Sequence, residues 1–89
     1  MKIKEGFVMR EVAGQALVVA TGKASQSFNG MIKLNSTAKD IWNLISEGKS
    51  ESEIISALCE KYDVTEQKAT ADTSSIIEKM RSAGVFEDE

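Results

Sequence analysis

The apolar residues change their spacing at Asn35, and this change constrains the fold of the 89-residue chain more than any other feature. Before Asn35, β-forming residues gather in the runs 7–13, 16–20 and 31–34, with glycines and polar residues between them. Runs of this kind are typical of antiparallel strands joined by short turns. After Asn35, apolar residues recur at the spacing of helices with one buried face. We therefore predict an α+β fold, in which a three-stranded antiparallel sheet is followed by three helices.

Short polar segments delimit the predicted strands. The dipeptide Gly14-Gln15 predicts a hairpin with a type II′ turn, because glycine supplies the positive φ of the first turn position. The polar segment Thr21–Ser27 is expected to be a loop. Phe28-Asn29-Gly30 then leads into the third strand, Met31–Leu34. Since consecutive strands usually lie next to each other, we predict the order 1-2-3, with the third strand at an edge of the sheet.

Capping residues delimit the predicted helices. Asn35-Ser36-Thr37 offers three N-cap candidates for the first helix, and Gly48 ends it. A capping box formed by Ser50 and Glu53 starts the second helix. The residues expected to face the core share helical spacing. They are Ala38, Ile41, Trp42 and Ile45 in the first helix, Ile54, Ile55 and Leu58 in the second, and Ala69, Thr73, Ile76, Ile77 and Met80 in the third.

The second and third predicted helices are joined by the short connection Asp63-Val64, with the third between Thr65 and Gly84. Such a pair resembles a helix-turn-helix, and the hairpin would be its wing. We expect one winged helix-turn-helix-like domain over residues 1–89, with its core at about 7–86. No apolar run reaches the roughly 18 residues of a membrane span, and the first residues lack the apolar segment of a signal peptide. We therefore expect a cytoplasmic protein that does not bind membranes.

Missing residue types exclude several kinds of site. The sequence has no histidine and one cysteine, Cys59, which excludes imidazole catalysis, an internal disulfide and a multi-thiolate metal centre. It also has no glycine-rich phosphate loop. Cys59 stands next to Glu60 and lacks the electropositive setting of a reactive thiol, so we interpret it as a half-buried apolar residue. These absences favour a binding protein without metal, cofactor or catalytic residues over an enzyme.

Charge is divided unevenly along the chain. Residues 1–34 carry a net charge of +3, whereas residues 35–89 carry −6. A winged-helix DNA-binding protein is the alternative function. The second helix, one candidate recognition helix, carries three glutamates against Lys61 alone. Because phosphate contacts dominate affinity for DNA, acidic recognition helices work against this alternative, and we expect no nucleic acid among the partners.

Two blocks of residues carry a family resemblance. The first block is Phe28–Asn35 with Ile41–Ile45 and Gly48, and the second is Leu58, Tyr62–Val64, Asp72, Ile76-Ile77, Met80 and Gly84-Val85. At this spacing the blocks resemble the PqqD family over residues 7 to 86. These small proteins are named for a component of pyrroloquinoline quinone (PQQ) biosynthesis, and they share their domain with the precursor-peptide recognition elements of peptide-modifying systems. Thr73 departs from the family pattern, because valine is common at this position.

The resemblance implies a non-catalytic adaptor. Such an adaptor binds the leader segment of a ribosomally made precursor peptide and presents it to a modifying enzyme, which in the quinone pathway is a radical-SAM protein. Any iron–sulfur cluster or SAM would belong to that enzyme. The resemblance does not say which precursor, enzyme or product belongs to this chain, or whether its pathway is that of PQQ.

The third strand supplies the predicted binding edge. An extended peptide can add there as a fourth strand, so we predict contacts with Met31, Ile32, Lys33 and Leu34. In the family the groove lies between this strand and the third helix. We interpret Ile76 and Met80 as core and predict that the neighbouring row lines the groove. This row is Thr70, Ser74, Ile77 and Arg81.

Several assignments have two interpretations. Lys33 either pairs with an acidic leader residue or discourages aggregation at the edge. Trp42 and Phe28 are expected in the core rather than in contact with a ligand. An unpaired edge also permits pairing between two copies, so both a monomer and a dimer are compatible with the sequence. A third function, a structural subunit attached to a larger enzyme through the same edge, also stays open.

Overall fold

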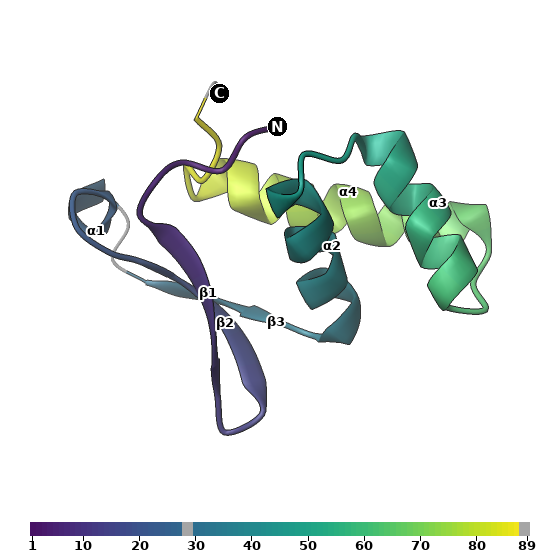
Figure 1. Cartoon of the computed structure of the whole chain (residues 1–89), viewed down its shortest axis with the longest axis horizontal. Helices are drawn as coiled ribbons and strands as arrows, with labels where there is room; N and C mark the ends of the chain where they lie inside the picture. The colour runs from purple at the N-terminus through teal and green to yellow at the C-terminus, as the bar shows by residue number, and fades with distance from the viewer. Residues whose placement is uncertain (28–29, 88–89) are drawn as a thin grey trace.

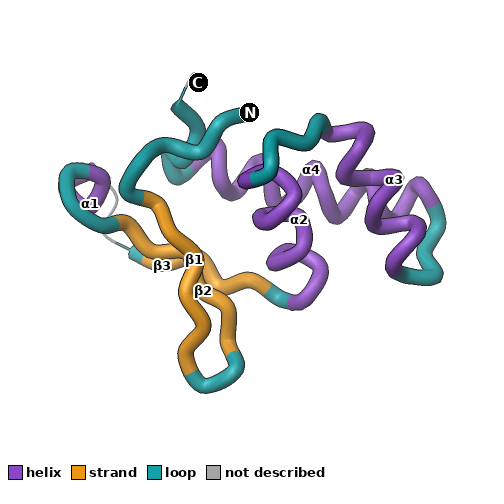
Figure 2. Tube along the Cα trace, viewed as in Figure 1, coloured by secondary structure: helices purple, strands orange, loops and turns teal. Residues whose placement is uncertain are grey.

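The computed structural model describes residues 1–27 and 30–87 (Figure 1). Its elements are β1 (Phe7–Val12), β2 (Gln15–Ala20), α1 (Ala24–Ser27), β3 (Met31–Leu34), α2 (Ser36–Ser46), α3 (Glu51–Lys61) and α4 (Glu66–Ser82). The strands form one antiparallel sheet in the order β1-β2-β3. The helices α2, α3 and α4 follow the sheet and cluster together (Figure 2). The predicted α+β layout is confirmed.

The hairpin turn differs from the prediction by one residue. Val12 pairs with Gln15, so the turn residues are Ala13 and Gly14, with φ of 53° and 80°. Positive φ at both positions defines a type I′ turn, whose twist matches that of the strands better than most alternatives. The predicted type II′ turn over Gly14-Gln15 is therefore wrong, because a type II′ turn needs positive φ only at its first position.

The segment expected to be a loop between β2 and β3 contains the short helix α1. Ser25 Oγ donates a hydrogen bond to the carbonyl oxygen of Gly22 at 2.6 Å. The amide of Thr21 donates to the carbonyl oxygen of Gly6 at 2.7 Å, which holds this segment against the start of β1. Gly6 has φ of 102°, and a Cβ there would lie 2.9 Å from the Cβ of Ala24, so only glycine fits without a shift. The predicted core position of Phe28 lies outside the described residues.

The predicted caps hold the three longer helices. The side chain of Asn35 accepts a hydrogen bond from the amide of Ala38 and caps α2. Ser50 and Glu53 form the expected capping box of α3, and hydrogen bonds from Ser50 lower the pKa of Glu53. Thr65 caps α4 through the amide of Lys68. Local side-chain chemistry therefore fixes where each helix begins.

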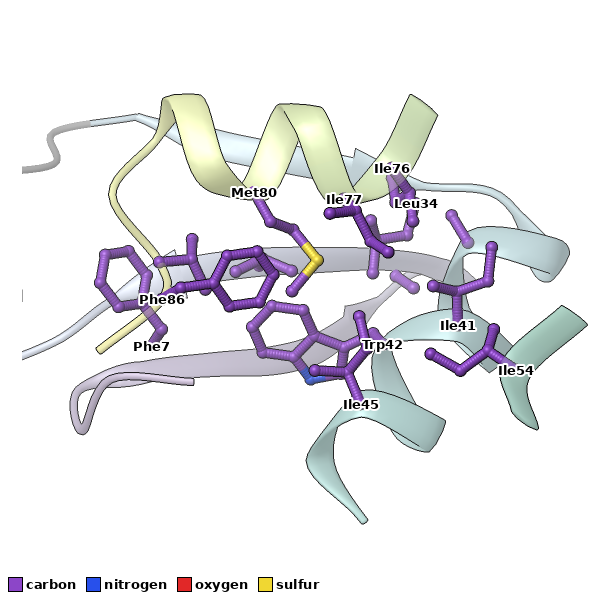
Figure 3. Packing of buried hydrophobic residues seen from close by; sticks show 14 of the residues in the cluster. Phe7, Leu34, Ile41, Trp42, Ile45, Ile54, Ile76, Ile77, Met80 and Phe86 are labelled. Atoms are coloured by element: carbon purple, nitrogen blue, oxygen red, sulfur yellow. The ribbon is translucent and has the colours of Figure 1, made fainter. Parts of the chain in front are cut away.

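The core lies between the inner face of the sheet and the helices (Figure 3). Every predicted core residue of α2 and α4 is buried, whereas Ile55 of α3 is half-buried. The sheet contributes Phe7, Ala16, Val18 and Leu34. Figure 3 shows Trp42 beside Ile45 and facing Met80, which agrees with its predicted structural role.

The two ends of the chain close the core on one side. Val85 and Phe86 follow α4 and are 0% and 1% exposed. Ile3 forms a β-bridge with Phe86, and the amide of Lys4 donates to the carbonyl oxygen of Val85 at 2.7 Å. The N-terminal segment is thereby held beside the end of α4. No helix in the described residues has the length and apolar character needed to cross a membrane.

Candidate functional site

The outer edge of β3 is open in the part of the chain that the structure describes. β3 pairs with β2 along one side, from Ala16↔Leu34 to Val19↔Met31. The N-terminal segment, which could in principle cover such an edge, pairs instead with residues after α4. The edge that the sequence predicted is therefore accessible to an added strand.

The hairpin sets which backbone groups of β2 face each neighbour. Its loop has two residues, so Val12 and Gln15 form the hydrogen-bonded pair that closes it. Hydrogen-bonded and non-hydrogen-bonded pairs alternate along an antiparallel ladder. Gln15 therefore bonds toward β1, and Ala16 and Val18 bond toward β3.

This alternation continues into β3. Ile32 and Leu34 are paired with Val18 and Ala16, so their N–H and C=O groups face β2. The N–H and C=O groups of Met31 and Lys33 consequently point toward the open edge. Their side chains lie on the face of the sheet opposite the core, where Met31 is 57% exposed.

A groove runs between β3 and α4. Its deeper part is a hollow of about 330 Å³, with Ile41, Leu58 and Ile76 among its apolar lining. A shallower hollow continues it toward Met31, Ile32 and the end of α4. Lys33 and Lys79 line both hollows. An extended peptide at the edge of β3 would therefore lie over an apolar floor, between a strand and a helix.

The face of α4 toward the groove is not the predicted one. The row of α4 residues that lines the groove is Lys68, Asp72, Ser75, Lys79 and Ser82, which follow one another at i, i+4, i+7, i+11 and i+14. Ala69 and Ile76 reach the groove from the edge of the core stripe. We call these five residues the groove row.

The predicted row lies on the other flank of the core stripe. The structure places Thr70, Ser74, Ile77 and Arg81 outside the lining of both hollows. Ile77 is 3% exposed and belongs to the core, so its prediction as a peptide contact is wrong. Thr70 donates a hydrogen bond to the carbonyl oxygen of Glu66 at 2.7 Å. Both flanks border the same apolar stripe, and only the position of β3 distinguishes them.

Ion pairs organise the charges of the groove. Asp72 pairs with Lys68 at 3.0 Å, and Glu78 pairs with Arg81 at 2.7 Å. Lys33 and Lys79 form no ion pair within residues 1–27 and 30–87. These two lysines are the charges that a ligand meets on the two walls of the groove.

Tyr62 closes the deep end of the groove. Its hydroxyl donates a hydrogen bond to the carboxylate of Asp40, which also accepts one from Lys61 at 3.1 Å. This hydrogen bond to Asp40 raises the pKa of Tyr62 above its ordinary value, and the bond from Lys61 to Asp40 raises the pKa of Lys61. α2 and the end of α3 are thereby joined beside the hollow.

Cys59 is half-buried and packs against the core, as predicted. Within the described residues, no three His, Cys, Asp or Glu side chains are grouped so that they could hold a metal ion.

Comparison with known proteins places this architecture. Residues 9–85 match the family described as coenzyme PQQ synthesis protein D (PqqD). The chain therefore belongs to the PqqD family, and the resemblance inferred from its residues is confirmed. No curated protein matches the sequence.

Two solved structures share the fold. One is TbiB1 in complex with the TbiA(beta) leader peptide, at 21% identity and a TM-score of 0.79, covering 100% of this chain and 98% of that one. The other is a lasso peptide synthetase B1 complexed with the leader peptide, at 17% identity and a TM-score of 0.76, covering 94% and 93%. At these identities the likeness establishes the fold, which extends over the whole of this domain.

Proposed function

We propose that the chain is a non-catalytic adaptor that binds the leader segment of a ribosomally made precursor peptide along β3 and presents it to a modifying enzyme. The observation that carries this proposal is the open edge at Met31 and Lys33 beside a groove with an apolar floor. Membership of the PqqD family supports it, as does the bound leader peptide named for each of the two structural neighbours. Nothing in these comparisons supports the DNA-binding alternative.

Backbone pairing alone does not supply enough affinity. Met31 and Lys33 offer two N–H and two C=O groups, and four hydrogen bonds contribute about 2–6 kcal/mol. Micromolar binding requires about 8 kcal/mol, after an association cost of at least about 4 kcal/mol. Two or three apolar leader side chains, each contributing about 1.5–3 kcal/mol on burial, would supply the difference. The floor around Ile41, Leu58 and Ile76 provides a place for them.

We assign the chemistry of modification to the partner enzyme, which we propose to be of the radical-SAM type. A chain without histidine and with a single cysteine contributes peptide positioning instead of covalent chemistry. Because ribosomally made precursors are available in the cytoplasm, we place the adaptor there.

Substitution of Lys33 by proline tests the proposed edge pairing. Proline removes the outward amide of β3 but leaves the pairing with β2, and it is tolerated at edge positions of this kind. Lys33→Ala is the matched control, because it removes the same side chain and keeps the amide. Calorimetric titration with the leader of the precursor encoded beside this gene should show that Lys33→Pro binds at least about 10-fold more weakly than Lys33→Ala.

Equal affinities in two folded variants would contradict edge pairing. Ile32→Pro, the substitution that the sequence alone suggests, is a poorer test. The amide of Ile32 faces β2, so its loss disturbs the sheet itself.

A further inference from the structure

The groove carries more positive charge than the protein as a whole. Its charged lining consists of three lysines, Lys33, Lys68 and Lys79, and two acidic residues, Asp72 and Glu78. The complete chain, in contrast, has a net charge of −3. Positive charge is therefore concentrated where the proposed peptide would lie.

The ion pairs leave this excess on two residues. Asp72 is neutralised by Lys68 of its own helix, and Glu78 by Arg81. Lys33 and Lys79 have no acidic partner in the described parts of the chain, and both line the two hollows. One lies on β3 and the other on α4, so they stand on opposite walls of one groove.

A peptide strand at this edge needs something to fix its register. Backbone hydrogen bonds are the same for every sequence, and a slip of one residue turns each side chain to the opposite face. Apolar side chains on a broad floor restrict the register only in part. A charge placed between two lysines restricts it further, because only one alignment brings it to them.

Building on the proposed function, we propose that the bound peptide carries an aspartate or glutamate that pairs with Lys33 and Lys79 and sets the peptide's register. Protection of the edge from aggregation accounts for a lysine on β3. It does not account for Lys79, which stands on the facing helix. The acidic residue lies at a fixed distance along the peptide from the apolar residues that occupy the floor near Ile76.

Selection from a library of random displayed peptides tests this proposal without knowledge of the natural leader. Three proteins are used as targets: the wild type, Lys79→Glu, and Lys49→Glu as the control. Lys49 is exposed in the turn after α2 and lines neither hollow, so its substitution makes the same charge change away from the groove. Circular dichroism confirms that each variant is folded.

Peptides selected by the wild type and by Lys49→Glu should share an acidic residue at a constant offset from their apolar residues. Lys79→Glu should select neutral or basic residues at that offset. For one selected peptide, replacing the acid by its amide should weaken binding to the wild type about 2- to 5-fold at low salt, and the difference should shrink at high salt.

The outcomes separate this proposal from the proposed function. Selection of peptides without an acidic preference, or with the same preference in Lys79→Glu, would overturn the acidic register while leaving peptide binding intact. Failure of the wild type to select any peptide would contradict the proposed function itself, and the acidic register with it.

Discussion

Substitution of Thr73 by valine should stabilise the protein. Thr73 is 0% exposed, and its Oγ1 has no hydrogen-bond partner in the described structure. It stands in the apolar stripe of α4, between Ala69 and the pair Ile76-Ile77. A hydroxyl buried in this way loses its hydrogen bonds to water and gains none in return.

The magnitude follows from this environment. Burial of an unpaired hydroxyl costs about 1–3 kcal/mol, on the evidence of substitutions in proteins. Valine has nearly the same shape as threonine and a similar helix propensity, so it fills the site without a cavity or a change in backbone preference. We expect Thr73→Val to raise the free energy of unfolding by about 1–3 kcal/mol. In a domain of this size, each kcal/mol raises Tm by roughly 4–8 °C.

Urea denaturation followed by circular dichroism measures this change. Thr70→Val is the matched control on the same helix, because Thr70 is exposed and its hydroxyl has a partner in the carbonyl of Glu66. We expect a change within about 0.5 kcal/mol for this control. If Thr73→Val is neutral or destabilising, the hydroxyl has a partner, such as a buried water, and the reasoning fails.

Two further predictions concern the hairpin and Tyr62. Ala13→Asn should raise the free energy of unfolding by about 1 kcal/mol in a thermal melt, because Asn tolerates the positive φ of Ala13 better; Ala13→Val should lower it, and equal stability of the two would refute this. Asp40→Asn should lower the midpoint of phenolate formation at Tyr62, the only tyrosine, in an absorbance titration. The raised pKa means that this bond stabilises the fold fully below the unfolded pKa of about 10 and is lost as pH rises through the folded pKa, so an unchanged midpoint would show that the bond does not form.

Most of the fold could be predicted from sequence because its signals are local. Asn35, the Ser50–Glu53 box and Thr65 bond to amides within three residues, so neighbouring positions alone define the helix starts. The buried stripes of α2 and α4 follow from helical spacing. The turn at Ala13-Gly14 could not be placed correctly, because it depends on the register between two strands.

The edge of the site could also be predicted, but its helical wall could not. Strand order alone makes β3 an edge. The core stripe of α4, however, has two flanks, and both carry exposed polar residues. The side on which β3 lies depends on how α4 crosses the sheet, which no local signal reports. For the same reason Val85 and Phe86 were missed, since their burial depends on contacts with Ile3 and Lys4 at the other end of the chain.

Amide hydrogen exchange of β3, followed by NMR with and without leader peptide, tests strand addition most directly. The amide of Ile32 faces β2 and should be protected in both states, whereas the amides of Met31 and Lys33 should exchange rapidly in the free protein. On saturation with peptide, these two amides should become protected to a degree comparable with Ile32. Saturable binding that leaves Met31 and Lys33 exchanging as fast as before would show that the peptide docks elsewhere.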